Sequence, residues 1–423
     1  MKQAKIIPQL RFSGFDDDWE EKKLNEYLEP SKKKNLDNRY SKNDVLSVSG
    51  EFGIVNQIEF QGRSFAGEYV NNYGVVETND IVYTKSPLNA NPYGIIKSNF
   101  GKTGIVSTLY AVYKSKNNVD PCFIQTYFDL NKRLNDYLRP LVRKGAKNDM
   151  KVSSEDALLG NVVFPSKLEQ QKIGAFLSHV DSLIQAKTKK LESLNAVKKS
   201  LLQKCFPKAG EKVPEMRFES NQEWASINFE DCFSFLSNNS FSRDELNYEK
   251  GYIKNLHYGD VLIKVGEILN VSTASLPYIT QINSPKQYSK SFLKNGDIVI
   301  ADAAEDNTVG KCTEIQNCTE LLAAGLHTIA VRPKIEFAPT FLGFCINSES
   351  FHNQLLPLIQ GTKVSSISKS AIVDTVIYYP ISITEQQKIG QFFSKYDSLI
   401  SVQQKEIDKL KDIKKSLLQK MFV

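Results

Sequence analysis

The sequence of 423 residues lacks several features that would place it in specialised classes of protein. No uninterrupted apolar run approaches the roughly 20 residues that a membrane-spanning helix needs, and the N-terminus has no apolar signal core. We therefore expect a cytoplasmic protein with no membrane segment. The four histidines are unclustered, and no two of the six cysteines stand in a C-x-x-C pair, which argues against a structural zinc or a disulfide framework. The cysteines are Cys122, Cys205, Cys232, Cys312, Cys318 and Cys345.

Catalytic motifs are also missing. Gly101-Lys102-Thr103 resembles part of a phosphate loop, but Ile96 stands where the first glycine would be required. Asn91-Pro92-Tyr93 lacks the second proline of an adenine methyltransferase box, and no glycine-rich strand-turn precedes it. Glu21-Lys22-Lys23 after Asp16 to Asp18 is better explained as a charge run than as a nuclease motif. We expect no catalytic residue, no metal ligand and no cofactor in this chain.

What the sequence does contain is a long internal repeat. EQQKIGAFLSHVDSLI starts at Glu169 and EQQKIGQFFSKYDSLI starts at Glu385, and both copies continue to the same ending, KKSLLQK. Between Glu169–Phe206 and Glu385–Phe422, 22 of 38 positions are identical at a constant offset of 216 residues. Two copies at such a long period indicate a duplicated domain and not a solenoid.

Each half also opens alike, because Pro8, Arg11, Phe12 and Trp19 return as Pro214, Arg217, Phe218 and Trp224. The order is variable region, repeat, variable region, repeat. Short β-rich runs (80–84, 107–112, 297–301 and 328–331) alternate with turns and with two helical stretches, 122–138 and 339–356. We predict an α/β (α+β) chain with similar mixed domains at 1–165 and 208–381 and conserved spacer helices at 166–207 and 382–423.

Apolar residues in the repeated segments follow two interleaved series with a period of seven, which is typical of a coiled coil. Lys187 and Lys198 interrupt the seam of the first copy, and Gln403 and Lys414 interrupt the second at matching places, so these polar residues are interpreted as register marks. Thr384 to Gln387 is typical of a helix capping box. We predict an antiparallel intramolecular coiled coil with pseudo-two-fold symmetry. The alternative is that each helix covers only its own neighbouring domain. The seam and partner-contact residues are Ile173, Leu177, Val180, Ile184, Leu191, Leu194, Leu201, Ile389, Phe393, Tyr396, Ile400, Ile407, Leu410 and Leu417.

The net charge of +6 is unevenly distributed. Residues 167–208 carry nine basic and three acidic side chains, whereas residues 209–382 carry 14 basic and 20 acidic ones. The first repeated helix is therefore basic and the second variable region is acidic. Such a distribution permits nucleic-acid binding without establishing it.

The duplicated EQQKIG…DSLI…KKSLLQK helices, the repeated opening and the alternating order resemble the DNA-specificity subunit of type I restriction-modification enzymes over the whole chain. The resemblance implies two target-recognition domains, each binding one half of a split double-stranded DNA sequence, with helices that set the gap. It implies two modification methyltransferase subunits and two restriction subunits as partners. S-adenosylmethionine, ATP and Mg²⁺ would be used by those partners, and this chain would carry no reaction itself.

Under that resemblance, turn-rich segments of the variable regions are the candidates for DNA contact. Amide, aromatic and cationic groups crowd one Pro/Gly-rich loop of the first region, and basic residues flank Gly145 at a place matched by Gly361 in the second. Solvated loop residues are the alternative. The predicted DNA-binding residues are Lys85, Asn89, Asn91, Tyr93, Lys97, Lys102, Arg143, Lys144, Lys147, Lys311, Thr362, Lys363, Ser365 and Ser366.

Two other functions compete with this interpretation. A scaffold that joins two protein partners would explain the helices without DNA, and a stand-alone nuclease or methyltransferase would explain the partial motifs.

Overall fold

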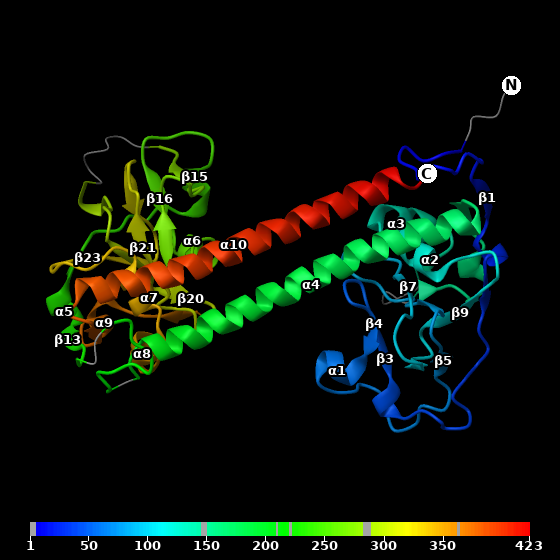
Figure 1. Ribbon diagram of the computed structural model, residues 1–423, viewed down its shortest axis with the longest axis horizontal. Coiled ribbons are helices and arrows are strands. Elements are labelled where there is room, and N and C mark those ends of the chain that lie inside the picture. Colours follow the sequence, from blue (N-terminus) through cyan, green and yellow to red (C-terminus); the bar gives the residue numbers. More distant parts are fainter. Residues whose placement is uncertain (1–5, 145–149, 209, 220–221, 282–288, 362–363) are drawn as a thin grey trace. The chain divides into compact units, whose positions relative to one another are not determined.

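The computed structural model describes residues 6–144, 150–208, 210–219, 222–281, 289–361 and 364–423. The chain forms two compact units (Figure 1). The first unit combines Met1–Thr188 with Lys405–Val423, and the second is Lys189–Gln404. Both long helices, α4 (Lys167–Cys205) and α10 (Ile383–Lys420), contribute residues to both units.

The first unit is a mixed α/β domain. Its main sheet has the strand order β2 (Leu28–Pro30), β9 (Ala111–Ser115), β6 (Ile81–Tyr83) and β7 (Ile96–Ser98), with all neighbours antiparallel. Helices α2 (Pro121–Phe128) and α3 (Asn131–Leu138) follow. The remaining strands and the short helix are β1 (Glu20–Lys23), β3 (Leu46–Ser49), β4 (Gly53–Asn56), α1 (Gln57–Gln61), β5 (Gly74–Val76), β8 (Gly104–Val106), β10 (Arg143–Lys144), β11 (Met150–Lys151) and β12 (Asn161–Phe164).

The second unit repeats this plan. Its sheet has the order β14 (Phe233–Phe235), β23 (Thr328–Pro333), β19 (Ile298–Ala301), β21 (Cys312–Gln316) and β17 (Ile268–Asn270), of which the first four match the first unit's sheet. Helices α7 (Phe341–Ile346) and α8 (Glu349–Leu355) follow β23 as α2 and α3 follow β9. The other elements are β13 (Ala225–Asn228), α5 (Phe229–Cys232), β15 (Leu246–Asn247), β16 (Lys254–Leu256), α6 (Tyr258–Ile263), β18 (Tyr278–Ile279), β20 (Ala303–Ala304), β22 (Leu322–Ala324), β24 (Ser365–Ser366), α9 (Lys369–Ile372) and β25 (Val376–Tyr379).

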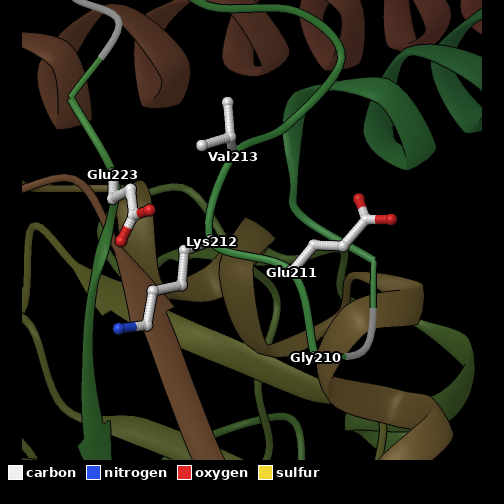
Figure 2. A pocket seen from close by; sticks show the side chains of 5 residues that line it. All are labelled: Gly210, Glu211, Lys212, Val213 and Glu223. Carbon is white, nitrogen blue, oxygen red and sulfur yellow. The ribbon is translucent and has the colours of Figure 1, made fainter.

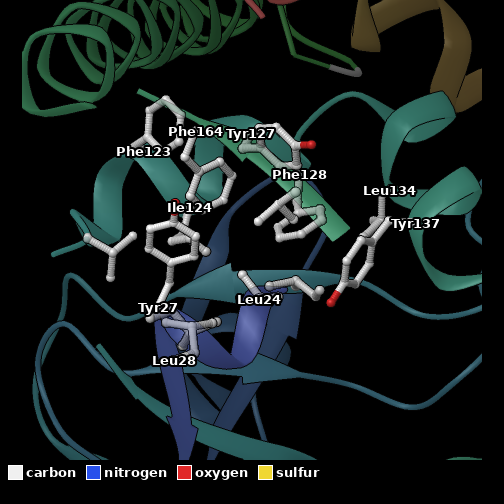
Figure 3. Close-up of a cluster of buried hydrophobic side chains, with 14 of the residues drawn as sticks. Leu24, Tyr27, Leu28, Phe123, Ile124, Tyr127, Phe128, Leu134, Tyr137 and Phe164 are labelled. Atoms are coloured by element: carbon white, nitrogen blue, oxygen red, sulfur yellow. The ribbon is translucent and has the colours of Figure 1, made fainter. Parts of the chain in front are cut away.

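Side chains alternate between the two faces of a strand, and in the central strand of each sheet the side chains on both faces are buried. Ile298 and Ile300 pack into one apolar cluster of the second unit, and Val299 packs into another. In the first unit Tyr83 belongs to the large aromatic cluster drawn in part in Figure 3, whereas Val82 belongs to a smaller one. Each sheet is therefore a layer between two apolar cores.

The two long helices pair antiparallel within each unit. In the first unit Lys187 contacts Glu406 and Asp181 contacts Lys414, and in the second Lys198 contacts Asp397. Every apolar seam residue predicted from the period of seven is buried or half-buried. The predicted mixed α/β fold with two long, antiparallel paired helices is confirmed. In the described part of the chain, no helix combines the length and apolarity needed to cross a bilayer.

Several local predictions need correction. The helix cap is Ser382 and not Thr384, because α10 begins at Ile383 and the Ser382 hydroxyl accepts from the Glu385 N–H. Residues 107–110 form a turn, closed by a bond from the Tyr110 N–H to the Ser107 carbonyl, so the strand starts at Ala111. The helical stretches 122–138 and 339–356 are each broken into separate short helices.

Candidate nucleic-acid interface

The repeated glutamates at the start of the long helices are clamped by the repeated arginines. Arg11 binds Glu169 through two parallel bonds, both 2.8 Å long, and Arg217 binds Glu385 through bonds of 2.7 and 2.8 Å. Both carboxylates are only 1% exposed. A bidentate pair compensates the charge of both side chains and also fixes their relative orientation. The opening segment of each half is therefore held on the long helix of the same half.

The next residues of the repeat hold each helix against its domain. Gln170 accepts from the Asp120 N–H and Gln386 accepts from the Ala338 N–H, at 3.0 and 2.9 Å. Gly390 lies so close to α7 that an added Cβ would be 2.3 Å from the Thr340 hydroxyl. The repeated Glu-Gln-Gln-Lys-Ile-Gly sequence is thus explained as the segment that docks each helix on its domain.

Lys414 and Lys198, which interrupt the seam, are the centres of two equivalent ion networks. In the first unit the Lys414 ammonium lies 2.7 Å from Asp181 and 2.8 Å from Asp129, whose other oxygen is 2.6 Å from Lys97. Burial raises the pKa of Asp129, but Lys97 and Lys414 outweigh it and leave the pKa below its ordinary value.

In the second unit the Lys198 ammonium lies 2.5 Å from Asp397 and 2.8 Å from Glu267. Each network therefore joins one helix, its antiparallel partner and the adjacent domain.

The C-terminal ends of the two long helices also pack on their domains in the same way. Phe422 packs edge-on to Trp19 at 6.3 Å, and Phe206 packs edge-on to Trp224 at 5.8 Å.

A family model matches the part of the chain that includes the contact between Gln386 and Ala338. Residues 221–412 match the model described as type I restriction modification DNA specificity domain. The resemblance to type I specificity subunits that the repeated helices indicated is confirmed. The chain is 24% identical over 360 residues to the type I restriction enzyme MjaVIII specificity subunit of Methanocaldococcus jannaschii, covering 81% of this chain and 78% of the relative. It is also 25% identical over 154 residues to the putative MjaX specificity subunit of the same organism, or 36% of each chain.

Solved structures share the fold over nearly the full length. The type I restriction-modification S subunit from M. genitalium has a TM-score of 0.53 at 13% identity and covers 99% of both chains. A chain from a solved type I restriction-modification system has the same TM-score at 14% identity, covering 96% of this chain and 97% of that one. The two-domain plan with two long helices is therefore the specificity-subunit fold.

Within this specificity-subunit fold, the predicted DNA-contact loop of the first unit divides into free and engaged residues. Asn89 and Lys102 are exposed. Lys97 is 9% exposed and committed to Asp129, and Asn91 donates to Asn131 at 3.0 Å. Tyr93 packs beside the aromatic cluster of the first unit. Lys97 and Asn91 thus hold the loop on α2 and α3, which leaves the exposed residues for a ligand.

Other predicted DNA contacts lie at the edges of the domains. Arg143 is exposed on β10. Lys311 donates to the carbonyls of Leu262 and Val265, and burial lowers its pKa. Ser366 and Ser365 pair with Ala303 and Ala304 in the short sheet β20–β24. The backbone of Lys144 lies in β10, while Lys147, Thr362 and Lys363 fall outside the described residues.

Two places in the second unit were not singled out by the sequence. One is a surface hollow of about 530 Å³ in the segment that links α4 to β13, lined by Gly210, Glu211, Lys212, Val213 and Glu223 (Figure 2). Its described lining offers two carboxylates and one ammonium and no aromatic surface. The other is a polar group at the end of β19, where Asp302 meets His327. No sequence signal marks that pair, because the two residues become neighbours only through the pairing of β19 with β23.

Proposed function

We propose that this chain is the DNA-binding specificity subunit of a type I restriction-modification complex and that each unit binds one half of a bipartite duplex target. The observation that carries the proposal is the duplication of the Arg–Glu, Gln and Lys contacts at the same helical positions, while the domains they hold differ in their loops. Repeated anchors with divergent loops are what two different recognition tasks on one frame require.

The paired helices are proposed to set the gap between the half-sites. Two rigid readers bind successive major grooves when their spacing matches about one helical turn of DNA, roughly 34–36 Å. The Lys414 and Lys198 networks support this role because each ties a domain to both helices and so opposes sliding of the seam.

The helices are also proposed to dock two methyltransferase subunits. Outside the seam they carry exposed apolar residues in matching places: Leu183 is 41% exposed and Leu399 is 55% exposed, while Val197 and Ile413 are 45% and 42% exposed. Members of each pair are 216 residues apart. A duplicated apolar patch suits two copies of one partner, arranged about a pseudo-two-fold axis.

The chemistry is assigned to the partners. Two restriction subunits and two modification subunits would use ATP, Mg²⁺ and S-adenosylmethionine, and the chain itself would hold none of these. Isolated chain should therefore have no nuclease, ATPase or methyltransferase activity. Activity that persists after the partners are rigorously removed would favour the enzyme alternative.

The docking and DNA roles are tested on the assembled complex. Wild-type chain should copurify with methyltransferase in a 1:2 ratio and should bind a bipartite duplex. A chain with both Leu183→Asp and Ile413→Asp should copurify with one methyltransferase copy fewer, because charged side chains replace the apolar contact of the first unit. Asp at the exposed Gln185 and Gln419, which lie on the same two helices of the first unit, is the matched control. A complete complex that binds no duplex would favour the scaffold alternative.

A further inference from the structure

A residue just beyond the central strand occupies an equivalent place in the two units. Ile81 of β6 lies opposite Tyr113 of β9, and Ile298 of β19 lies opposite Val331 of β23. Lys85 lies four residues after Ile81, and Asp302 lies four residues after Ile298. Both residues are just beyond the end of the strand. One position of the duplicated sheet therefore carries a cation in the first unit and a carboxylate in the second.

Several polar elements of the second unit converge on Asp302. The His327 Nδ1 lies 3.3 Å from the Asp302 carboxylate, and the Asp302 N–H donates to the His327 carbonyl at 3.1 Å. The ring of Tyr258, at the start of α6, packs edge-on to His327 at 5.4 Å. Asp302 is 25% exposed in its side chain and His327 is 52% exposed, so the pair is held in place and still accessible.

The charge of Asp302 is poorly compensated. Burial raises the pKa of its carboxyl, and His327 and Lys369 offset only part of that effect. A carboxylate kept partly desolvated has more to gain from a hydrogen-bond donor on a ligand than a solvated one has.

The backbone at this end of each sheet is strained in both units. Lys85 has φ of 49° and His327 has φ of 53°, in the left-handed region that residues with long or ring side chains seldom adopt. Of the other four described non-glycine residues in this region, three are asparagines, which tolerate it better. Strain of this kind persists where the surroundings impose it, and it gathers at ligand sites.

In the first unit Lys85 is half-buried beside the segment that precedes β12. Its ammonium donates to the Ser154 hydroxyl at 3.3 Å, and burial lowers its pKa while Glu155 offsets part of the effect. Within the described part of the chain, the Ser154 hydroxyl is the one hydrogen-bond acceptor of this ammonium, so two of its three protons are available to a ligand.

We propose that Lys85 and Asp302 are the equivalent base-contact residues of the two units and that their opposite chemistry makes the half-sites different. In the major groove an ammonium donates to O6 and N7 of guanine, whereas a carboxylate accepts from the N4 amino group of cytosine. Asp302, positioned by His327, selects cytosine in the second half-site, and Lys85 selects guanine in the first. This inference rests on the proposed DNA-binding function and adds the residues and the bases.

The test uses the full chain assembled with its methyltransferase partners. Duplex libraries randomised at one base pair at a time are competed for binding, and the methylated motif is sequenced in cells. Asp302→Asn should reduce the preference for cytosine at one position of the second half by about tenfold or more, with the first half unchanged. Lys85→Gln should relax one guanine position of the first half only.

Each control makes the same change of charge as one test variant, at an exposed site. Glu305→Gln, three residues beyond Asp302, matches Asp302→Asn, and Lys132→Gln, on the surface of α3, matches Lys85→Gln. Neither should alter the motif. A wild-type motif with unchanged base preferences in both test variants would overturn the inference. So would an equal loss of affinity for all sequences, since that indicates a phosphate contact or a folding defect. A wild-type complex without any bipartite motif would instead refute the proposed function.

Discussion

The Lys414 ammonium lies 2.7 Å from the Asp181 carboxylate, and 216 residues earlier along the chain Lys198 lies 2.5 Å from Asp397. Each lysine also binds a carboxylate of the adjacent domain, Asp129 or Glu267. The polar interruptions of the apolar seam are thus the places where helix, helix and domain meet.

Removing Lys414 should destabilise the first unit alone. Lys414→Met leaves Asp129, at 8% exposure, with only Lys97 opposite, and loss of one partner from a buried ion pair costs about 3 kcal/mol of unfolding free energy. Each unit contains one of the two tryptophans, so denaturation followed by fluorescence in a Trp224→Phe background reports on the first unit. Lys415→Met, at an exposed neighbour, is the control. Equal midpoints for the two variants would contradict the structural role of the network.

The period of seven in the sequence was sufficient to predict the helices, their seam and the special status of Lys198 and Lys414. It could not identify Asp129 and Glu267 as their partners, because these lie in the variable regions at no constant offset from each other. Lys97 and Lys311 were predicted to bind DNA from their charge and turn-rich context. Their engagement with Asp129 and with the carbonyls at the end of α6 depends on tertiary packing, which local sequence does not determine.

A methyl group on Gly390 should destabilise the second unit. Alanine normally stabilises a helix interior by about 1 kcal/mol relative to glycine, but here the added Cβ would lie 2.3 Å from the Thr340 hydroxyl. We expect Gly390→Ala to lower the denaturation midpoint, measured through Trp224 in a Trp19→Phe background. Gln391→Ala, at an exposed neighbouring position, should have little effect. A gain of stability in Gly390→Ala would mean that α10 does not approach α7 this closely.

The second unit should lose stability below neutral pH because of His257. Burial, reinforced by Arg243, lowers the pKa of this residue to about 4, with His327 lowering it further and Asp260 offsetting part of the shift. The unfolded chain takes up the proton near pH 6.5, so stability is present above that pH and falls as the pH drops toward 4. Unfolding free energies at pH 7.5 and 4.5 should differ by roughly 2 kcal/mol more in wild type than in His257→Asn.

His257→Asn is a conservative control because the cap is retained. His257 accepts from the Gly259 N–H at the start of α6, and Asn56 plays the corresponding part at the start of α1. If the variant keeps the same pH dependence as wild type, other groups cause the acid sensitivity.

Lengthening both helices should lengthen the gap. Four residues inserted after Thr188 and four after Gln404 lengthen α4 and α10 by about 6 Å each. The half-sites should then move apart by one or two base pairs at about 3.4 Å per pair, as measured by sequencing methylated DNA. The same four residues placed after Gly210, beyond the end of α4, should leave the gap unchanged. An unchanged gap in the helix variant would remove the helices from the spacing role.

The most direct test of independent recognition is a domain replacement. Residues 1–165 are exchanged for the corresponding region of a relative, and the methylated motif is sequenced in cells that also carry the partner subunits. The seam from Ile173 to Cys205 and from Ile389 to Met421 is untouched, so assembly should survive. We predict a motif in which one half is new, while the other half and the gap are those of the wild type. A hybrid that assembles normally but changes both halves together would contradict the account.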